Sequence, residues 1–291
     1  MTKPQTQYIE IDGRLPDDEG MGLALVGYGH FTFMQVRAHA VRGLDLHLER
    51  LDRGTRELFG TGLDHDRVRH YVRHALRGTS GDASVRVQVV PSDPGVLLRG
   101  GSDEPRVMVM VRAPAEPDEA PQRLRSVEYE RPLPHLKHLD TMGLIHQARL
   151  ARQAGYDGAL FTDRTGHVSE ADLANVVFWE GEFGDLEFAE ADGKEGTGKE
   201  GAFVWPDAPA LPGVMRGMLR RGMERLGVPV HDRPVHRSEL PRLGSAFLTN
   251  SLNDGQPVAS VDGLPFTVHE RARALLRACH EANNWQALNG D

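Results

Sequence analysis

One stretch of the sequence comes close to the spacing of a phosphate-binding loop. Gly193-Lys194-Glu195-Gly196-Thr197-Gly198-Lys199-Glu200 places glycines ahead of a lysine, a combination whose backbone amides and ammonium group can cradle phosphates. The hydroxyl that should hold magnesium is replaced by Glu200, whose carboxylate repels phosphate. Glu190 and Asp192 precede the stretch, and no apolar helix follows it. We therefore predict an acidic surface insertion here rather than a nucleotide site.

The 14 histidines raise the question of a metal site. His135-x-x-His138 and the stretch from His231 to His236 are the closest groupings, but no carboxylate beside them completes a helical i, i+4 ligand pair. Cys279 is the single cysteine, which excludes a disulfide framework and Cys-based zinc or iron–sulfur sites. We expect ordinary polar or core histidines, no metal, and a reducing, cytoplasmic location.

A third set of residues gains its meaning from its order along the chain. Singly, its charged members are typical of a protein surface. The sequence has no Gly-x-Ser-x-Gly elbow and no complete dinucleotide fingerprint, so hydrolase and nicotinamide chemistry lack positive support. In chain order the set reads Tyr28-Gly29-His30-Phe31-Thr32-Phe33, His47-Leu48-Glu49-Arg50-Leu51, Leu136-Lys137-His138-Leu139-Asp140, Gly155-Tyr156-Asp157-x-Ala159-Leu160-Phe161, Gly166-His167-Val168-Ser169-Glu170-x4-Asn175, Leu211-Pro212-Gly213-Val214-Met215-Arg216 and Phe247-Leu248-Thr249-Asn250-Ser251.

This series resembles the class IV aminotransferase family, the fold-type IV pyridoxal-phosphate enzymes, which include branched-chain and D-amino-acid aminotransferases and aminodeoxychorismate lyase. The resemblance runs from about Tyr28 to Val258 and is most specific between Lys137 and Ser251. It implies pyridoxal 5'-phosphate as cofactor and an α/β (α+β) fold. In that fold a small N-terminal α/β domain precedes a larger C-terminal domain with a barrel-like sheet, and the cofactor lies in the crevice between them. It also implies a homodimer, whose interface completes the active site.

The resemblance assigns the two residues that act on the cofactor's reactive groups. Pyridoxal phosphate needs an amine to hold its aldehyde as a Schiff base and to move protons at the substrate carbon, and Lys137 matches that amine. Because a lysine of ordinary pKa, about 10.4, is protonated at neutral pH, such a pocket must favour the neutral or imine form. Glu170 matches the carboxylate that keeps the pyridine nitrogen protonated and so strengthens electron withdrawal by the ring.

The phosphate of the cofactor needs a cationic fork and backbone donors, and the resemblance supplies both. Arg50 matches the family's phosphate-binding arginine. Val214 and Met215 open a predicted helix after Gly213, and their amides form a ready anion site. Ser251 aligns with the third residue of the family's Thr-Gly-Thr loop, which also touches phosphate.

Other matching positions have supporting roles. Asn175 matches an asparagine that we expect to brace Glu170 and the wall of the cofactor site. His47 fits an orienting role toward Arg50 better than a catalytic one. Phe33 and Arg37 lie on a predicted strand that faces the substrate in the family, where Arg37 either binds a substrate carboxylate or is a surface arginine at a strand edge.

The reaction itself stays open at this point. We favour transamination of an amino acid or related amine, because it is the family's commonest activity. An aminodeoxychorismate-lyase-like reaction, releasing pyruvate and an aromatic amine, is the alternative. The local spellings at Lys137-His138-Leu139-Asp140 and Thr249-Asn250-Ser251-Leu252 resemble the lyase, whereas Met34-Gln35 replaces its threonine pair. A family member that binds cofactor or metabolite without turnover is a further alternative, against which the presence of both Lys137 and Glu170 argues.

The spacing of apolar residues and the positions of glycines predict the helices and strands that carry these residues. Apolar residues at helical spacing, closed by a glycine, favour helices, and short valine-rich or alternating runs favour strands. The predicted helices are 44–59, 141–155, 212–226 and 268–283, and the predicted strands are 83–91, 106–112, 159–163, 165–169, 175–179 and 246–249.

Composition bounds the whole molecule. The 291 residues are 39% hydrophobic and 26% charged, which is typical of one large or two ordinary folded domains. The proline-rich, acidic stretch 113–121 reads as a linker, so we predict domains at 1–120 and 121–291. The net charge of −8 gives no field that would attract nucleic acid, and no apolar stretch is long enough to span a membrane. We expect a small-molecule substrate as partner.

Overall fold

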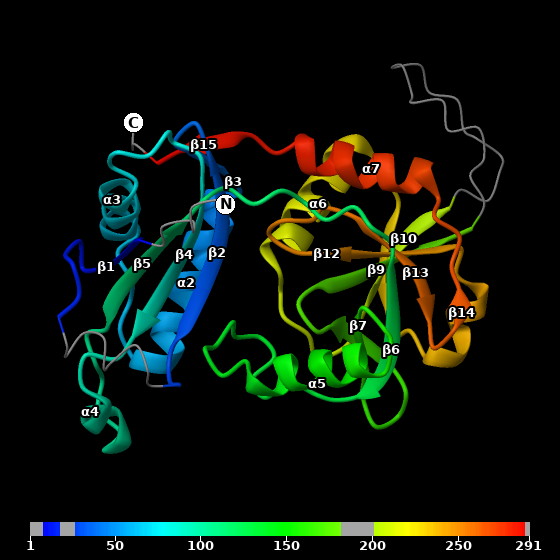
Figure 1. Cartoon of the computed structure of the whole chain (residues 1–291), viewed down its shortest axis with the longest axis horizontal. Coiled ribbons are helices and arrows are strands. Elements are labelled where there is room, and N and C mark those ends of the chain that lie inside the picture. The colour runs from blue at the N-terminus through cyan, green and yellow to red at the C-terminus, as the bar shows by residue number, and fades with distance from the viewer. Residues whose placement is uncertain (1–7, 18–26, 182–200, 289–291) are drawn as a thin grey trace, which may run out of the picture. The chain divides into compact units, whose positions relative to one another are not determined.

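The computed structural model describes residues 8–17, 27–181 and 201–288, so the predicted acidic insertion around Gly193 lies outside the described residues. The chain forms two compact units (Figure 1), which we describe separately. The first unit comprises Met1–Pro117, His135–Thr141 and Asn284–Asp291, and the second comprises Asp118–Pro134 and Met142–Asn283. The division into domains at 1–120 and 121–291 stays a prediction.

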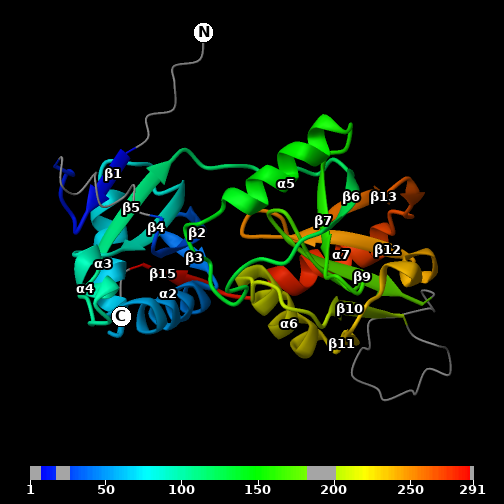
Figure 2. The same cartoon turned by 90° about the horizontal axis from the view of Figure 1, so that it is seen from below.

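An antiparallel sheet and two helices build the first unit. Apolar side chains from one face of the sheet pack with α2 (Leu44–Phe59) and α3 (His65–Ala75) into one core, and the short α4 (Pro94–Leu98) follows β4. Figure 2 shows α2 and α3 along this sheet. Within the described residues the strand order is β1 (Tyr8–Ile11), β5 (Arg106–Arg112), β4 (Ala83–Val90), β2 (His30–Arg37), β3 (Ala40–Arg42) and β15 (Trp285–Ala287).

The side chains of strand β2 alternate between the two faces of the sheet. Its even-numbered residues are fully buried and its odd-numbered residues are half-buried, from His30 to Arg37. Met34 is 0% exposed and lies in the core with the helices. The side chain of Met34 therefore points to the core face, whereas Gln35 lies on the opposite, open face.

A short segment of the first unit is fastened to the beginning of β2. The amide of Phe31 donates to the carbonyl of Lys137, and the amide of Leu139 donates to the carbonyl of Gly29, both at 2.9 Å. Gly29 has φ +147°, and a Cβ there would lie 2.4 Å from the carbonyl oxygen of Val89. Only glycine therefore lets the strand, its neighbour and the Lys137 segment approach so closely.

A mixed sheet forms the second unit and curls into a half-barrel. Its ends approach each other, since Val168 of β8 and Val204 of β10 belong to one core cluster. This confirms the predicted barrel-like sheet. Within the described residues the strand order is β11 (Val230–Arg233), β10 (Ala202–Pro206), β9 (Asn175–Glu180), β12 (Ser245–Thr249), β13 (Gln256–Val261), β6 (Gln122–Glu128), β7 (Gly158–Thr162) and β8 (Val168–Ala171), with β14 (Leu264–Pro265) beside β13.

Three helices and a short 3-10 helix complete the second unit. They are α5 (Met142–Gln153), α6 (Val214–Leu226), α7 (Glu270–Glu281) and η1 (Arg237–Arg242). Helices α6 and α7 lie side by side (Figures 1 and 2), and a Cβ at Gly222 of α6 would lie 2.0 Å from the carbonyl oxygen of Cys279 in α7. The four predicted helices and the six predicted strands are confirmed within a few residues at their ends. No helix among the described residues is long and apolar enough to cross a membrane.

Candidate active site

Lys137 lies on the open face of the first unit's sheet. Its ammonium nitrogen is 4.8 Å from the centre of the Phe31 ring. The guanidinium carbon of Arg86, on β4, lies 3.9 Å from the same ring centre. Because Phe33 pairs directly with Arg86 across the sheet, Arg86 shares the face that carries the half-buried side chains of β2. The amine therefore has an aromatic surface and a second cation around it.

A buried hydrogen-bonded chain holds Arg50. From α2, Nη2 of Arg50 donates to the hydroxyl of Thr32 on β2, and that hydroxyl lies 2.7 Å from Nδ1 of His47. The exposed fractions of Arg50, Thr32 and His47 are 6%, 0% and 2%. The chain is satisfied when Thr32 accepts from Arg50 and donates to a neutral His47. His47 thus contacts the group that positions Arg50, as the sequence led us to expect.

Two histidines of this region are kept neutral. Burial, followed by the charges of Arg50 and Lys137, lowers the pKa of His47 well below its usual value. Burial and the charge of Arg50 lower the pKa of His30 to about 3. Nε2 of His30 lies 3.0 Å from the hydroxyl of Thr55. Neither imidazole therefore adds a positive charge beside Arg50 near neutral pH.

In the second unit, Glu170 lies on β8 and is 3% exposed. Arg131, in the segment after β6, makes three hydrogen bonds of 2.7–3.0 Å to its carboxylate. Oε2 of Glu170 also accepts from the amide of Leu211 at 3.2 Å. The carboxylate is therefore held at both oxygens by groups of this chain.

Asn175 and Glu170 meet at the same peptide. From β9, Nδ2 of Asn175 donates to the carbonyl of Leu211 at 2.8 Å, while Glu170 accepts from the amide of Leu211. A Cβ at Gly213 would lie 2.2 Å from Oδ1 of Asn175, so this approach requires glycine. The two side chains together fix the segment that leads into α6.

The beginning of α6 has the features of an anion site. The N-cap residue is Gly213, which has no side chain to accept hydrogen bonds from the first amides, so the helix lacks a side-chain cap. Val214 and Met215, which follow it, are only 4% and 3% exposed. The first amides of a helix need acceptors and carry the positive end of its dipole. Thr249, directly opposite Asn175 on β12, has a buried hydroxyl with no hydrogen-bond partner among the described residues. Ser251 follows two residues later, in the loop between β12 and β13.

Phe33 and Arg37 lie on the half-buried face of β2. Arg37 donates to the carbonyls of Val36 and Ala115, each at 3.0 Å, and its Nη2 lies 3.8 Å from the carboxylate of Glu116. These contacts tie the predicted linker to β2. Substrate binding by Phe33 and Arg37 stays a prediction.

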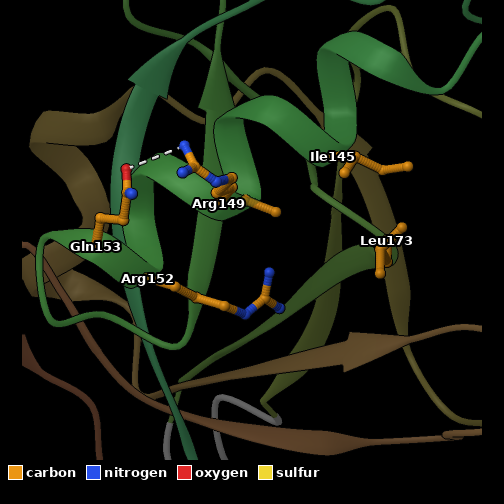
Figure 3. Close-up of a pocket in the computed structure, with 6 residues that line it drawn as sticks. Ile145, Arg149, Arg152, Gln153 and Leu173 are labelled. Atoms are coloured by element: carbon orange, nitrogen blue, oxygen red, sulfur yellow. Dashed lines mark hydrogen bonds between the residues drawn. The ribbon is translucent and has the colours of Figure 1, made fainter.

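A hollow of about 440 Å³ opens elsewhere on the second unit (Figure 3). Leu173 faces it from one side, and α5 supplies the remaining lining residues, which are Ile145, Ala148, Arg149, Arg152 and Gln153. None of the predicted site residues lines it. Among the described residues, no cluster of three or more histidine, cysteine or acidic side chains could hold a metal ion.

The sequence motifs do not include two arginines of these clusters. Arg131 and Arg86 belong to none of the motifs quoted above, and each has the neighbours of an ordinary surface or strand arginine in the sequence. One signal for Arg86 in the sequence is that it is the single charged residue of the valine-rich strand 83–90. Arg131 gave no comparable signal, because its partner Glu170 is 39 residues away.

Comparison with known families decides what this arrangement belongs to. A family model described as amino-transferase class IV matches residues 29–261, which include every predicted cofactor-binding residue. The chain belongs to the class IV aminotransferase family. A search of curated proteins finds no match.

Solved structures show the same fold for this class IV aminotransferase. A branched-chain aminotransferase of Thermoproteus uzoniensis, solved with norvaline, has a TM-score of 0.74 at 20% identity, with 96% of this chain and 94% of that one covered. A Legionella pneumophila protein described provisionally as a 4-amino-4-deoxychorismate lyase has a TM-score of 0.69 at 21% identity, covering 88% and 91%. A hypothetical aminotransferase of Mycobacterium tuberculosis in its PLP-bound form has a TM-score of 0.69 at 18% identity, covering 89% and 90%.

As a class IV aminotransferase, the protein is a pyridoxal-phosphate-dependent enzyme, and its residues fit that cofactor. The second unit offers a buried carboxylate for a protonated ring nitrogen and an uncapped helix start for a phosphate. The hydroxyl of Thr249, which has no hydrogen-bond partner in the described part of the chain, belongs to β12, beside the strand that carries Asn175. The first unit offers the amine of Lys137 and the buried guanidinium of Arg50.

The neutral histidines predict a specific loss of stability in acid. The unfolded chain binds a proton at His30 below a pH of about 6.5, whereas the folded chain resists it down to about 3. The contribution of the neutral His30 to the free energy of unfolding is therefore fully present above pH 6.5. It is lost as the pH falls from about 6.5 toward about 3. His30 alone should cost about 1.4 kcal/mol between pH 7.5 and 5.5. Urea unfolding at both values should show that His30→Gln loses about this much less than the wild type.

The exposed His231 provides the matched control, since His231→Gln should retain the wild-type pH dependence. An equal loss on acidification in the wild type and in His30→Gln would contradict the assignment of a buried neutral imidazole.

Proposed function

We propose that the protein is an aminotransferase that acts on an amino acid or related amine, with Lys137 as the Schiff-base lysine. The observation that carries the proposal is the buried carboxylate of Glu170 bonded to Leu211, three residues before the uncapped start of α6. Three residues span at most roughly 11 Å, so an acid and an anion site lie close together. Pyridoxal phosphate is a small ring with a basic nitrogen and a phosphate, which matches that pair.

Each residue then has a defined task. When bound, the cofactor supplies an electron sink for the substrate carbon. Lys137 supplies the amine and moves the proton at that carbon. Glu170 holds the proton of the ring nitrogen, and Asn175 keeps the Leu211 peptide in place for it.

We assign four donors of this chain to the phosphate of the cofactor. Arg50 supplies the guanidinium, Val214 and Met215 supply amides, and Ser251 supplies a hydroxyl. His47 stays neutral beside Arg50, so it adds no second positive charge next to the guanidinium. The assignment of these residues to one cofactor rests on the family resemblance and on the geometry within each unit.

The cofactor assignment predicts distinct effects at two positions. Borohydride reduction of the holoprotein should link the cofactor covalently to Lys137, and Lys137→Ala should abolish turnover. Arg50→Ala removes a charge-assisted contact and should weaken cofactor binding by about 1.5–3 kcal/mol. Peptide mapping and fluorescence titration measure the two effects. A label on another residue, or unchanged cofactor affinity in Arg50→Ala, contradicts the respective role.

The lyase alternative keeps specific support from the sequence. The segment around Lys137-His138-Leu139-Asp140 resembles the lyase spelling, and the argument against it from Met34 fails because Met34 is a core residue. We keep transamination as the leading proposal because it is the commonest activity of the family.

Product analysis separates the two reactions. A transaminase keeps the amino group on its cofactor, so an amino donor alone should bleach the visible band of the holoprotein and release at most one equivalent of the donor's own keto acid. A lyase regenerates its cofactor, so aminodeoxychorismate alone should release pyruvate continuously. We expect bleaching with at least one donor of an amino-acid panel. Steady pyruvate release, with no donor bleaching the band, would establish the lyase instead.

We further propose that the substrate carries a negative charge away from its reacting carbon. Arg86 lies against the same ring as Lys137, and within the described residues no carboxylate lies within ion-pair distance of it. Its Nε is buried without a hydrogen-bond partner there, and burial together with the charge of Arg112 lowers its pKa. A desolvated guanidinium gains most from an incoming carboxylate.

The carboxylate role predicts a change in substrate selectivity. Arg86→Gln should lower kcat/KM for dicarboxylic donors such as glutamate by roughly 10–100-fold, with kcat/KM for neutral donors nearly unchanged. Arg112→Gln is the control, because Arg112 lies on the same face of the adjacent strand but is exposed. Steady-state kinetics with both donor classes tests this. Equal losses for acidic and neutral donors would show that Arg86 only supports the fold.

Assembly and location follow the family resemblance. We propose a homodimer, in which the interface completes the active site. We propose a reducing compartment such as the cytoplasm, because the single cysteine is buried and burial raises its pKa to about 11, which makes it an inert thiol.

A further inference from the structure

Arg131 forms hydrogen bonds with both carboxylate oxygens of Glu170. Its Nε donates to Oε1 at 3.0 Å, and its Nη2 donates to Oε1 and Oε2 at 2.7 and 2.8 Å. The side chains of Arg131 and Glu170 are 7% and 4% exposed. Charge-assisted hydrogen bonds between two desolvated groups fix geometry far more firmly than a surface ion pair does.

The charge of Arg131 compensates the charge of the buried Glu170 carboxylate. A buried carboxylate without a compensating cation takes up a proton instead of remaining ionised. Within the described residues, the other partner of Glu170 is the amide of Leu211, which carries no net charge. Among the described residues, Arg131 therefore supplies the positive charge that faces this acid inside the unit.

We propose that Arg131 is a positioning residue for the cofactor ring, because it decides where the proton between Glu170 and the ring nitrogen lies. The inference rests on the proposed function, in which Glu170 faces that nitrogen. One proton is shared by two sites, the carboxylate and the nitrogen. Arg131 is bonded to the carboxylate, so its charge stabilises the form in which the carboxylate is negative and the proton is on the nitrogen.

The same contacts set the direction of Glu170 before any cofactor arrives. Among the residues that the structure describes, Arg131 donates to Oε1, and Arg131 and Leu211 donate to Oε2. With both oxygens held, the carboxylate cannot rotate away from its orientation. Such an arrangement lowers the reorganisation needed when a charged partner binds.

The test compares two ligands of the apoprotein, pyridoxal phosphate and its 1-deaza analogue, in which a carbon replaces the ring nitrogen. The wild type should bind pyridoxal phosphate at least roughly 10-fold more tightly, since only this ligand offers a protonated nitrogen to an ionised acid. In Arg131→Gln, which keeps hydrogen bonding but not charge, the ratio should fall to within about 3-fold. Arg131→Lys, which keeps the charge, should restore a large part of the ratio.

Controls separate this effect from a loss of fold. Arg233→Met removes ion pairs with Glu180 and Glu239 in the same unit and should leave the ratio at the wild-type value. Glu170→Gln should abolish the ratio, and adding Arg131→Gln to it should change the ratio no further. Melting curves of each apoprotein confirm that the variants compared are folded.

The outcomes distinguish the inference from the function on which it rests. If Arg131→Gln weakens both ligands equally and keeps their ratio, the positioning role is overturned while the cofactor assignment stands. If the wild type binds pyridoxal phosphate and the analogue equally, the contact of Glu170 with the ring nitrogen is overturned as well. If the wild type binds neither, the proposed function itself fails.

Discussion

The burial of one carboxylate organises the second unit. An ionised acid removed from water costs several kcal/mol unless a cation and hydrogen-bond donors compensate it. Glu170 receives both kinds of compensation, the cation from Arg131 and a backbone donor from Leu211. Because Leu211 leads directly into α6, the requirement of one acid fixes the segment after β6, strand β8 and the start of a helix together.

In the first unit the buried charged group is a cation, the guanidinium of Arg50. Arg50 lies in the core side of the sheet, where Thr32 accepts from it and His47 stays neutral. A charged histidine here would repel the guanidinium. The neutral imidazoles of His30 and His47 therefore add no second positive charge beside Arg50.

Local sequence patterns account for the parts of this structure that depend on neighbours in the chain. Leu44–Phe59 is recognisable as a helix because its apolar spacing and the following Gly60 act locally. The matched motifs singled out Glu170 and Asn175, and the structure shows that both side chains form hydrogen bonds with the Leu211 peptide. Arg131 was unrecognisable because its significance arises from a partner 39 residues away. The sequence alone could not place Met34 in the core, since alternation predicts that two faces exist but not which one packs against helices.

The course of the chain has a consequence for how this protein can be recombined with its relatives. Residues 135–141, which carry Lys137, belong to the first unit, yet the chain on both sides of them belongs to the second. A chimera made with one crossover after residue 117 would take Lys137 from one parent and its anchoring strand β2 from the other. The backbone pairing of Phe31 with Lys137, and the glycine at position 29 that permits it, would then have to match between parents. Exchange of the intact first unit requires three separate pieces of the gene.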